Sequence, residues 1–202
     1  MAGKPLIAWT VGAALESGIF ADVICSTDDD EIANAARDAG ASVPFMRPSE
    51  LASDTATSFD VVMHALKLMP SEYDWVCLLQ PTSPLRTAED LQSAFQIATD
   101  HACPAVVSVC ESAVHPYHCF QITQSGAMEG FFPAELRGQR RQDMPPSFTL
   151  NGAIYFIKPS VLAESKSFVP PGTMAYVMPV ERSIDIDDAD DFHQAERFLL
   201  NL

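Results

Sequence analysis

The stretch WVCLLQPTSPLR, residues 75–86, indicates the fold class. Its first five residues are all apolar, which is typical of a strand buried between two layers of helices. The loop that follows, residues 80–86, contains two prolines that stiffen it, together with an amide, hydroxyls and a guanidinium. Because ligands of open α/β sheets bind beyond the carboxyl ends of strands, this loop is predicted to orient a polar substrate. A simple turn before a helix capped at Thr87 is the alternative.

On both sides of this stretch, short apolar runs alternate with segments of helical periodicity. Helices are predicted over residues 5–17, 30–39 and 59–69, after Thr87, and over residues 188–200. Strands are predicted over residues 22–26, 43–46, 75–79, 105–109, 153–157 and 176–178. This alternation predicts an α/β fold in which helices flank a mostly parallel open sheet, and the length fits one domain over residues 1–202.

The alternation breaks between residues 111 and 152, where glycines and prolines separate short segments. We predict an inserted arm there. Arg137, Arg140, Arg141 and Lys158 lie in this arm or flank its exit, although the chain as a whole is acidic. The arm is therefore expected to face an anionic ligand or partner.

Composition excludes several classes of protein. Among 202 residues, 48% are hydrophobic, and 12 Lys and Arg residues against 27 Asp and Glu residues give a net charge of −15, which disfavours nucleic acid and anionic membranes. No apolar run approaches the roughly 20 residues that span a bilayer, and no signal region follows Met1. The five cysteines form no CxxC pair and are expected to be reduced. A soluble, cytoplasmic protein is expected.

Two clusters of aspartates suggest different roles. In SIDID, residues 183–187, Asp185 and Asp187 would project from one face of an extended backbone, and paired carboxylates suit Mg²⁺ beside a substrate phosphate. The alternative is a solvated turn in which Asp187 or Asp188 caps the last helix. For residues 28–30, which follow a predicted strand and precede a helix, capping is favoured over metal binding.

Residues 47–58 join a predicted strand to a helix and place hydroxyls and backbone N–H groups at the start of that helix. A phosphate or the edge of a base could bind there. The alternative is capping by Thr57 or Ser58, which leaves Arg47 unexplained.

Five motifs together resemble the acylneuraminate cytidylyltransferase family, whose members activate sialic acids. They are STDDDEI (26–32), RPSELASDTATS (47–58), LLQPTSPLR (78–86), LNGAIYF (150–156) and SIDIDDADDF (183–192). The resemblance covers nearly the whole chain in family order. It implies a nucleotide-diphospho-sugar transferase-like fold and an enzyme that converts CTP and a nonulosonic acid to a CMP-sugar and pyrophosphate with Mg²⁺.

The resemblance also assigns roles to eight residues. By motif, Arg47, Ala56 and Ser58 correspond to contacts with CTP, whereas Gln80, Arg141 and Tyr155 correspond to contacts with the sugar acid. Asp185 and Asp187 correspond to the catalytic, metal-binding aspartates. The family's reaction is an in-line attack of the anomeric hydroxyl on the α-phosphorus. The arm, residues 111–152, is implied to form a two-fold homodimer.

The sequence departs from the family pattern at its start. Family members begin with an apolar strand and a basic phosphate-binding loop, whereas this sequence begins at MAGKPLI. Because that strand lies inside the sheet in the family, we expect two unpaired strand edges unless another segment or subunit fills the gap. Loss of the phosphate-binding loop is expected to lower the catalytic rate. The alternative function is a non-catalytic module that binds a sugar acid or forms dimers. A glycosyltransferase that uses Asp185 and Asp187 is a third hypothesis.

Overall fold

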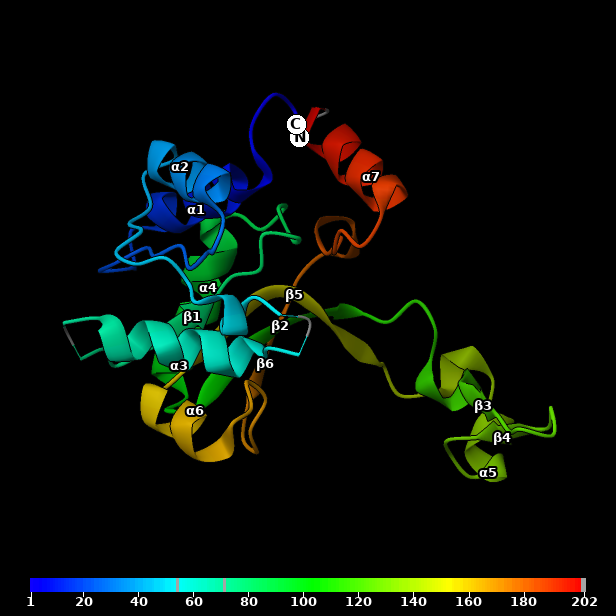
Figure 1. Cartoon of the computed structure of the whole chain (residues 1–202). Coiled ribbons are helices and arrows are strands. Elements are labelled where there is room, and N and C mark those ends of the chain that lie inside the picture. Colours follow the sequence, from blue (N-terminus) through cyan, green and yellow to red (C-terminus); the bar gives the residue numbers. More distant parts are fainter. Residues whose placement is uncertain (54, 71, 201–202) are drawn as a thin grey trace.

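A computed structural model describes residues 1–53, 55–70 and 72–200, with the backbone alone at Arg141 (Figure 1). The helices are α1 (Leu6–Ser17), α2 (Asp30–Asp38), α3 (Ser58–Leu68), α4 (Ala88–Asp100), α5 (Ala134–Arg137), α6 (Pro159–Ser165) and α7 (Ala189–Leu200). The strands are β1 (Val76–Leu78), β2 (Ala105–Glu111), β3 (Phe120–Ile122), β4 (Met128–Gly130), β5 (Phe148–Ile157) and β6 (Met174–Val177). Short 3₁₀ turns are η1 (Ser49–Leu51), η2 (Pro116–His118), η3 (Arg141–Asp143) and η4 (Val180–Arg182).

The main sheet has four strands in the order β1-β5-β2-β6, so the predicted α/β fold is confirmed. Strand β5 is antiparallel to both of its neighbours, whereas β2 and β6 are parallel. The sheet is therefore mixed, and less parallel than predicted. Strand β2 leads into the arm and β5 returns from it alongside, which is the antiparallel arrangement that needs no crossover helix.

Two predicted strands, residues 22–26 and 43–46, are absent as strands. A single parallel bridge joins Ile24 to Ser42, in which Cys25 N donates to Ser42 O (2.9 Å) and Ser42 N donates to Val23 O (2.8 Å). Within the described residues, neither segment pairs with the four-stranded sheet. One isolated bridge is too short to make a strand, so the prediction of full strands is wrong here.

Helices cover both faces of the sheet. On one face, Leu91 and Ala94 of α4 pack with Ala13 of α1 against Ile154 and Phe156 of β5. On the other face, Val62 of α3 and Leu162 of α6 pack against Ala105 and Ile157. Alternate strand residues thus point to opposite helical layers, which explains why the strand runs are apolar throughout.

The predicted helix starts are confirmed by their caps. Asp29 Oδ1 accepts from Ile32 N at 2.9 Å, so the Asp28–Asp30 cluster starts α2, as predicted. Thr57 caps α3 in a capping box with Asp60, and Thr87 caps α4 in the same way with Asp90.

The arm extends away from the helices and the main sheet in Figure 1 and carries the β3–β4 hairpin and α5. Lys158 does not belong to it, because the ten residues of β5 carry the chain to the opposite end of the sheet, where Lys158 Nζ lies 5.4 Å from the centre of the Trp75 ring. In the described part of the chain, the five cysteines are unpaired. None of the described helices has the length and apolarity of a membrane-spanning segment.

Candidate functional site

Loops from three parts of the chain meet beside the end of β1. Ile186 N donates to Thr82 O at 2.8 Å, which ties the segment after η4 to the loop after β1. Ser83 Oγ donates to Asn151 O of β5 at 3.0 Å and lies 3.5 Å from Asp185 Oδ1. The rigid loop predicted to orient a substrate therefore borders both β5 and residues 183–187, which we call the aspartate segment.

Gly152 lies where these loops converge. It has a φ of +72°, and a Cβ atom built on it would lie 2.7 Å from Gln80 Oε1, 2.8 Å from Ser83 Oγ and 3.0 Å from Asp185 Oδ2. Burial, and secondarily the negative charge of Asp185, raises the pKa of Tyr155. The structure thus brings together three residues predicted from the sequence, namely Gln80, Tyr155 and Asp185.

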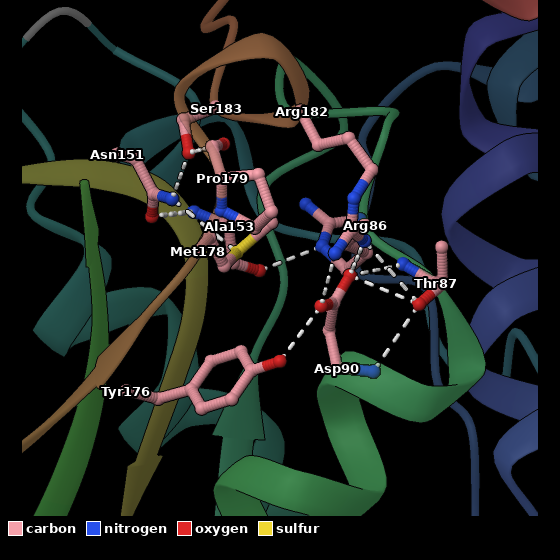
Figure 2. A network of polar contacts seen from close by, with 10 residues as sticks. All are labelled: Arg86, Thr87, Asp90, Asn151, Ala153, Tyr176, Met178, Pro179, Arg182 and Ser183. Atoms are coloured by element: carbon pink, nitrogen blue, oxygen red, sulfur yellow. Dashed lines mark hydrogen bonds and ion pairs between the residues drawn. The ribbon is translucent and has the colours of Figure 1, made fainter. Parts of the chain in front are cut away.

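A buried arginine fixes the loop that carries Gln80. Arg86 is only 3% exposed, and its Nε donates to Ala153 O at 2.7 Å (Figure 2). Its Nη1 donates to Thr10 Oγ1 at 2.7 Å. Its Nη2 donates to the backbone carbonyl of Gln80. Burial lowers the pKa of Arg86 to about 10, so the guanidinium is still charged at neutral pH. One side chain therefore links α1, the loop after β1 and β5.

A second network holds the aspartate segment in place. Arg182, which directly precedes that segment, forms an ion pair with Asp90, whose Oδ1 accepts from Arg182 Nη2 (2.9 Å) and Tyr176 Oη (2.8 Å), as Figure 2 shows. Burial alone would raise the pKa of Asp90, but hydrogen bonds from Arg182, the Thr87 backbone and Tyr176 hold it below its ordinary value. Burial and the hydrogen bond to Asp90 raise the pKa of Tyr176 to about 12. The aspartate segment therefore begins directly after a side chain that an ion pair holds in place.

The two predicted metal ligands differ in exposure. Asp185 is half-buried and borders Gly152, whereas Asp187 is exposed. Residues 183–187 belong to no strand of the structure, and the predicted projection of both carboxylates from one face of an extended backbone stays a prediction. Asp188 Oδ1 accepts from Asp190 N (2.8 Å) and Asp191 N (3.0 Å), which makes Asp188 the residue that caps α7. Among the described residues, the Asp187 carboxylate makes no hydrogen bond and so is available to a ligand.

The described side chains contain no group of three or more His, Cys, Asp or Glu residues arranged to hold a metal ion. Mg²⁺ characteristically takes one or two carboxylates and completes its shell with water and substrate phosphates. Asp185 and Asp187 supply oxygen donors of that kind, so the residues present fit a magnesium ion that arrives with a nucleotide.

Three predicted nucleotide contacts, Arg47, Ala56 and Ser58, line one cavity of about 870 Å³ together with Gln80. Arg47 Nη2 donates to Asp28 Oδ1 at 3.0 Å, and this hydrogen bond lowers the pKa of Asp28. Its buried Nε has no hydrogen-bond partner among the described residues. The Arg47 side chain thus lines the cavity and also forms an ion pair with Asp28.

Arg141, the remaining predicted residue, belongs to η3 in the arm, and its side chain lies outside the described part of the structure. Its predicted contact with the sugar acid therefore stays a prediction.

Sequence reasoning placed Ser83 only among the hydroxyls of the loop after β1, and it missed Asn151 and Gly152 as members of the site. Asn151 is 3% exposed, accepts from Ser108 Oγ at 2.6 Å and donates to Ser183 Oγ at 2.9 Å. The pairing register of β2 and β5 shifts between Val107 and Val109 of β2, opposite the part of β5 that contains Asn151 and Gly152. A glycine inside an apolar strand run is the signal that could have located the bulge.

Substitution of Gly152 by Ala is expected to lower the free energy of unfolding by about 1–3 kcal/mol, because the new Cβ forces Gln80, Ser83 or Asp185 to move and strains the backbone. Urea denaturation followed by circular dichroism measures this loss. Gly126→Ala is the matched control, since Gly126 has a φ of +83° but nothing within 4 Å of its Cβ position. Equal losses in the two variants would show that only backbone strain matters at Gly152.

Known proteins resemble this chain in sequence and in fold. A family model described as Cytidylyltransferase matches residues 1–124. The chain is 37% identical over 194 residues to an N-acylneuraminate cytidylyltransferase from Streptococcus agalactiae, covering 95% of this chain but only 46% of that protein, so it spans about half the relative's length. It is 35% identical over 206 residues to a CMP-N,N'-diacetyllegionaminic acid synthase from Legionella pneumophila, covering 98% of this chain and 87% of that protein.

Among solved structures, a CMP:2-keto-3-deoxy-manno-octonic acid synthetase complexed with CTP superposes with a TM-score of 0.68. It shares 16% sequence identity, and the match covers 99% of this chain and 90% of that one, which shows a common fold. The family match covers more than half of the chain, in agreement with the motifs that suggested it. The chain therefore belongs to the cytidylyltransferase family.

Proposed function

We propose that this chain transfers CMP from CTP to a sialic-type nonulosonic acid and releases pyrophosphate. The observation that carries the proposal is the convergence of Gln80, Tyr155 and Asp185 around Gly152, beside a cavity lined by Arg47 and Ser58. The names of the streptococcal and Legionella relatives support this class of substrate.

In this proposal the cavity and the aspartate segment bind the two substrates side by side. Arg47 and the Ser58 hydroxyl at the start of α3, which both line the cavity, contact the cytidine part of CTP. Gln80 and Tyr155, together with Arg141 from the arm, contact the sugar acid. A carboxylate substrate suits an arginine because the guanidinium binds it with two parallel hydrogen bonds.

Asp185 and Asp187 are the proposed ligands of Mg²⁺, which when bound neutralises charge on the phosphates. The anomeric oxygen of the sugar acid forms a bond to the α-phosphorus as the bond between that phosphorus and the bridging oxygen to the β-phosphate breaks. The hydroxyl proton passes to the exposed Asp187 carboxylate, and pyrophosphate leaves.

The arm is proposed to form a homodimer interface. It exposes large apolar side chains on and around its hairpin, namely Val114, Phe120, Ile122, Met128, Phe131, Phe132 and Phe148. Apolar side chains gathered in this way are typical of protein interaction surfaces. A cytoplasmic location is proposed as well, because unpaired cysteines are typical of a reducing compartment.

The test is pyrophosphate release by the 202-residue chain with CTP, Mg²⁺ and a panel of nonulosonic acids. We expect release that requires both substrates and matches the CMP-sugar formed mole for mole. Calorimetric titration of the same preparation with each substrate is the companion measurement. Sugar-acid binding without CTP binding or pyrophosphate release would instead support the non-catalytic module.

A further inference from the structure

The start of α4 makes more polar contacts than a helix cap requires. Asp90 forms the capping box with Thr87, and its two carboxylate oxygens also accept one hydrogen bond each from the Arg182 guanidinium (Figure 2). Tyr176 Oη donates to the same carboxylate at 2.8 Å. Asp90 is only 1% exposed, so the ion pair that it forms is largely withdrawn from water.

The capping box of α3 shows what capping alone needs. Thr57 and Asp60 make the same reciprocal contacts there, although Asp60 is exposed and forms no ion pair within the described residues. Burial of a charged pair adds little net stability, because the loss of hydration offsets the attraction between the charges. Neither capping nor stability therefore explains why Asp90 is buried against Arg182.

The aspartate segment has little secondary structure of its own. Residues 183–187 belong to no helix or strand, and among the described residues the backbone N–H groups of Ile184 and Asp185 donate to no other group. Downstream of Asp185, Ile186 N donates to Thr82 O at 2.8 Å. The position of the Asp185 backbone therefore depends on what holds the segment on its two sides.

Upstream of Asp185, two side chains hold the segment. Ser183 Oγ accepts from Asn151 Nδ2 of β5 at 2.9 Å, and Arg182 is bound to Asp90 of α4. Helix α4 begins directly after the loop that follows β1. The ion pair therefore fixes the aspartate segment relative to the loop that is predicted to orient the substrate.

The Asp185 carboxylate packs closely against its neighbours. Its Oδ1 lies 3.5 Å from Ser83 Oγ, and its Oδ2 lies 3.0 Å from the position of a Cβ atom built on Gly152. Side chains of a functional site need to be held within about 0.5 Å of their working geometry. Around a metal ion, groups bonded to the ligands and to their supports supply that precision.

We propose that Asp90 and Arg182 are positioning residues. They hold Asp185 and Asp187 in the arrangement in which both carboxylates bind Mg²⁺ beside a nucleotide, and they act without touching the metal ion or the substrates. This role rests on the proposed function, because it requires the magnesium site of that proposal. It extends the site to the buried start of α4.

Amide hydrogen exchange of the unliganded chain, followed by NMR, tests whether the ion pair holds the segment. In Arg182→Gln, exchange of the Ile186 amide is expected to accelerate at least about 10-fold. The amide of Cys25, which donates to Ser42 O and takes no part in the network, is expected to change far less. An unchanged rate at Ile186, or the same acceleration at both amides, would contradict a local positioning role.

Binding of MnCTP in the absence of a sugar acid is the second readout. Mn²⁺ takes oxygen ligands as Mg²⁺ does, and as a paramagnetic ion it broadens the NMR signals of nearby amides. The concentration of MnCTP that half-saturates the broadening at residues 184–190 is expected to rise at least about 10-fold in Arg182→Gln and in Asp90→Asn. Arg182→Lys, which keeps the positive charge, is expected to recover part of the lost affinity.

Two exposed residues supply matched controls. Arg197→Gln on α7 and Glu89→Gln at the start of α4 remove the same charges, and both chains are expected to bind MnCTP as the unmodified chain does. If Arg182→Gln and Asp90→Asn also bind it with unchanged affinity, the positioning role is wrong and the proposed magnesium site stands. If the unmodified chain shows no broadening at residues 184–190, the magnesium site is wrong and the positioning role falls with it. Should Arg182→Gln fail to fold, Asp90→Asn, which keeps the shape of the side chain, serves for both measurements.

Discussion

Replacement of Arg86 by Met is expected to lower the free energy of unfolding by about 3–5 kcal/mol, the largest loss predicted for a single site in this chain. The substitution removes the donors to Ala153 O, Thr10 Oγ1 and the Gln80 carbonyl. Those acceptors would be left without partners in a site where Arg86 itself is 3% exposed, and buried acceptors without donors are costly. Urea unfolding at neutral pH measures the loss.

The control is Arg37→Met, on the exposed face of α2, where Arg37 Nη1 donates to the Asn34 side chain at 3.0 Å. Its effect is expected to stay within about 0.5 kcal/mol. If Arg86→Met lowers the free energy of unfolding by less than about 1 kcal/mol, then β5 and the loop that follows β1 stay together without the guanidinium.

Asp187→Asn is expected to lower the rate of CMP transfer by about 100-fold or more, because in the proposed mechanism this one carboxylate both binds Mg²⁺ and receives the hydroxyl proton. The side chain is exposed and makes no hydrogen bond among the described residues, so the free energy of unfolding should change by less than about 0.5 kcal/mol. Pyrophosphate release under saturating CTP and Mg²⁺ measures the effect.

Asp190→Asn supplies the matched control, since Asp190 is an exposed aspartate in the first turn of α7 with the same charge change. Its rate is expected to equal that of the unmodified chain. If Asp187→Asn retains full activity, or if both variants lose activity equally, the assigned role of Asp187 is wrong.

Much of the fold could be predicted because periodicity and caps are local signals. The apolar run before Gln80 indicated a strand, and Thr87 indicated the start of α4. The direction of β5 could not be derived, because a strand that is apolar throughout looks the same whether its neighbours are parallel or antiparallel. Residues 22–26 were predicted to form a strand because they are a short apolar run. A strand also needs a pairing partner, and the apolar pattern of one segment does not report whether a partner lies beside it.

The candidate site was predictable where a motif marks it and not where packing forms it. Gln80, Tyr155 and Asp185 were found by resemblance, and the structure brings them together at Gly152. Arg86 seemed part of a substrate-binding loop, yet burial directs its guanidinium inward to Thr10 and Ala153. Whether a charged side chain points to a ligand or to the core depends on tertiary contacts, which one sequence does not reveal.

The Arg86 contacts also affect how the chain folds during translation. Ala153 lies 67 residues after Arg86 and Thr10 lies 76 residues before it. At about 5–20 residues per second, a ribosome takes roughly 3–13 s to add the 67 residues that separate Arg86 from Ala153. Throughout that interval β1 also lacks β5, its partner in the sheet. The nascent chain therefore presents an apolar edge to chaperones until residues 148–157 have left the exit tunnel, and a slow codon placed before that point would prolong the exposure and favour aggregation.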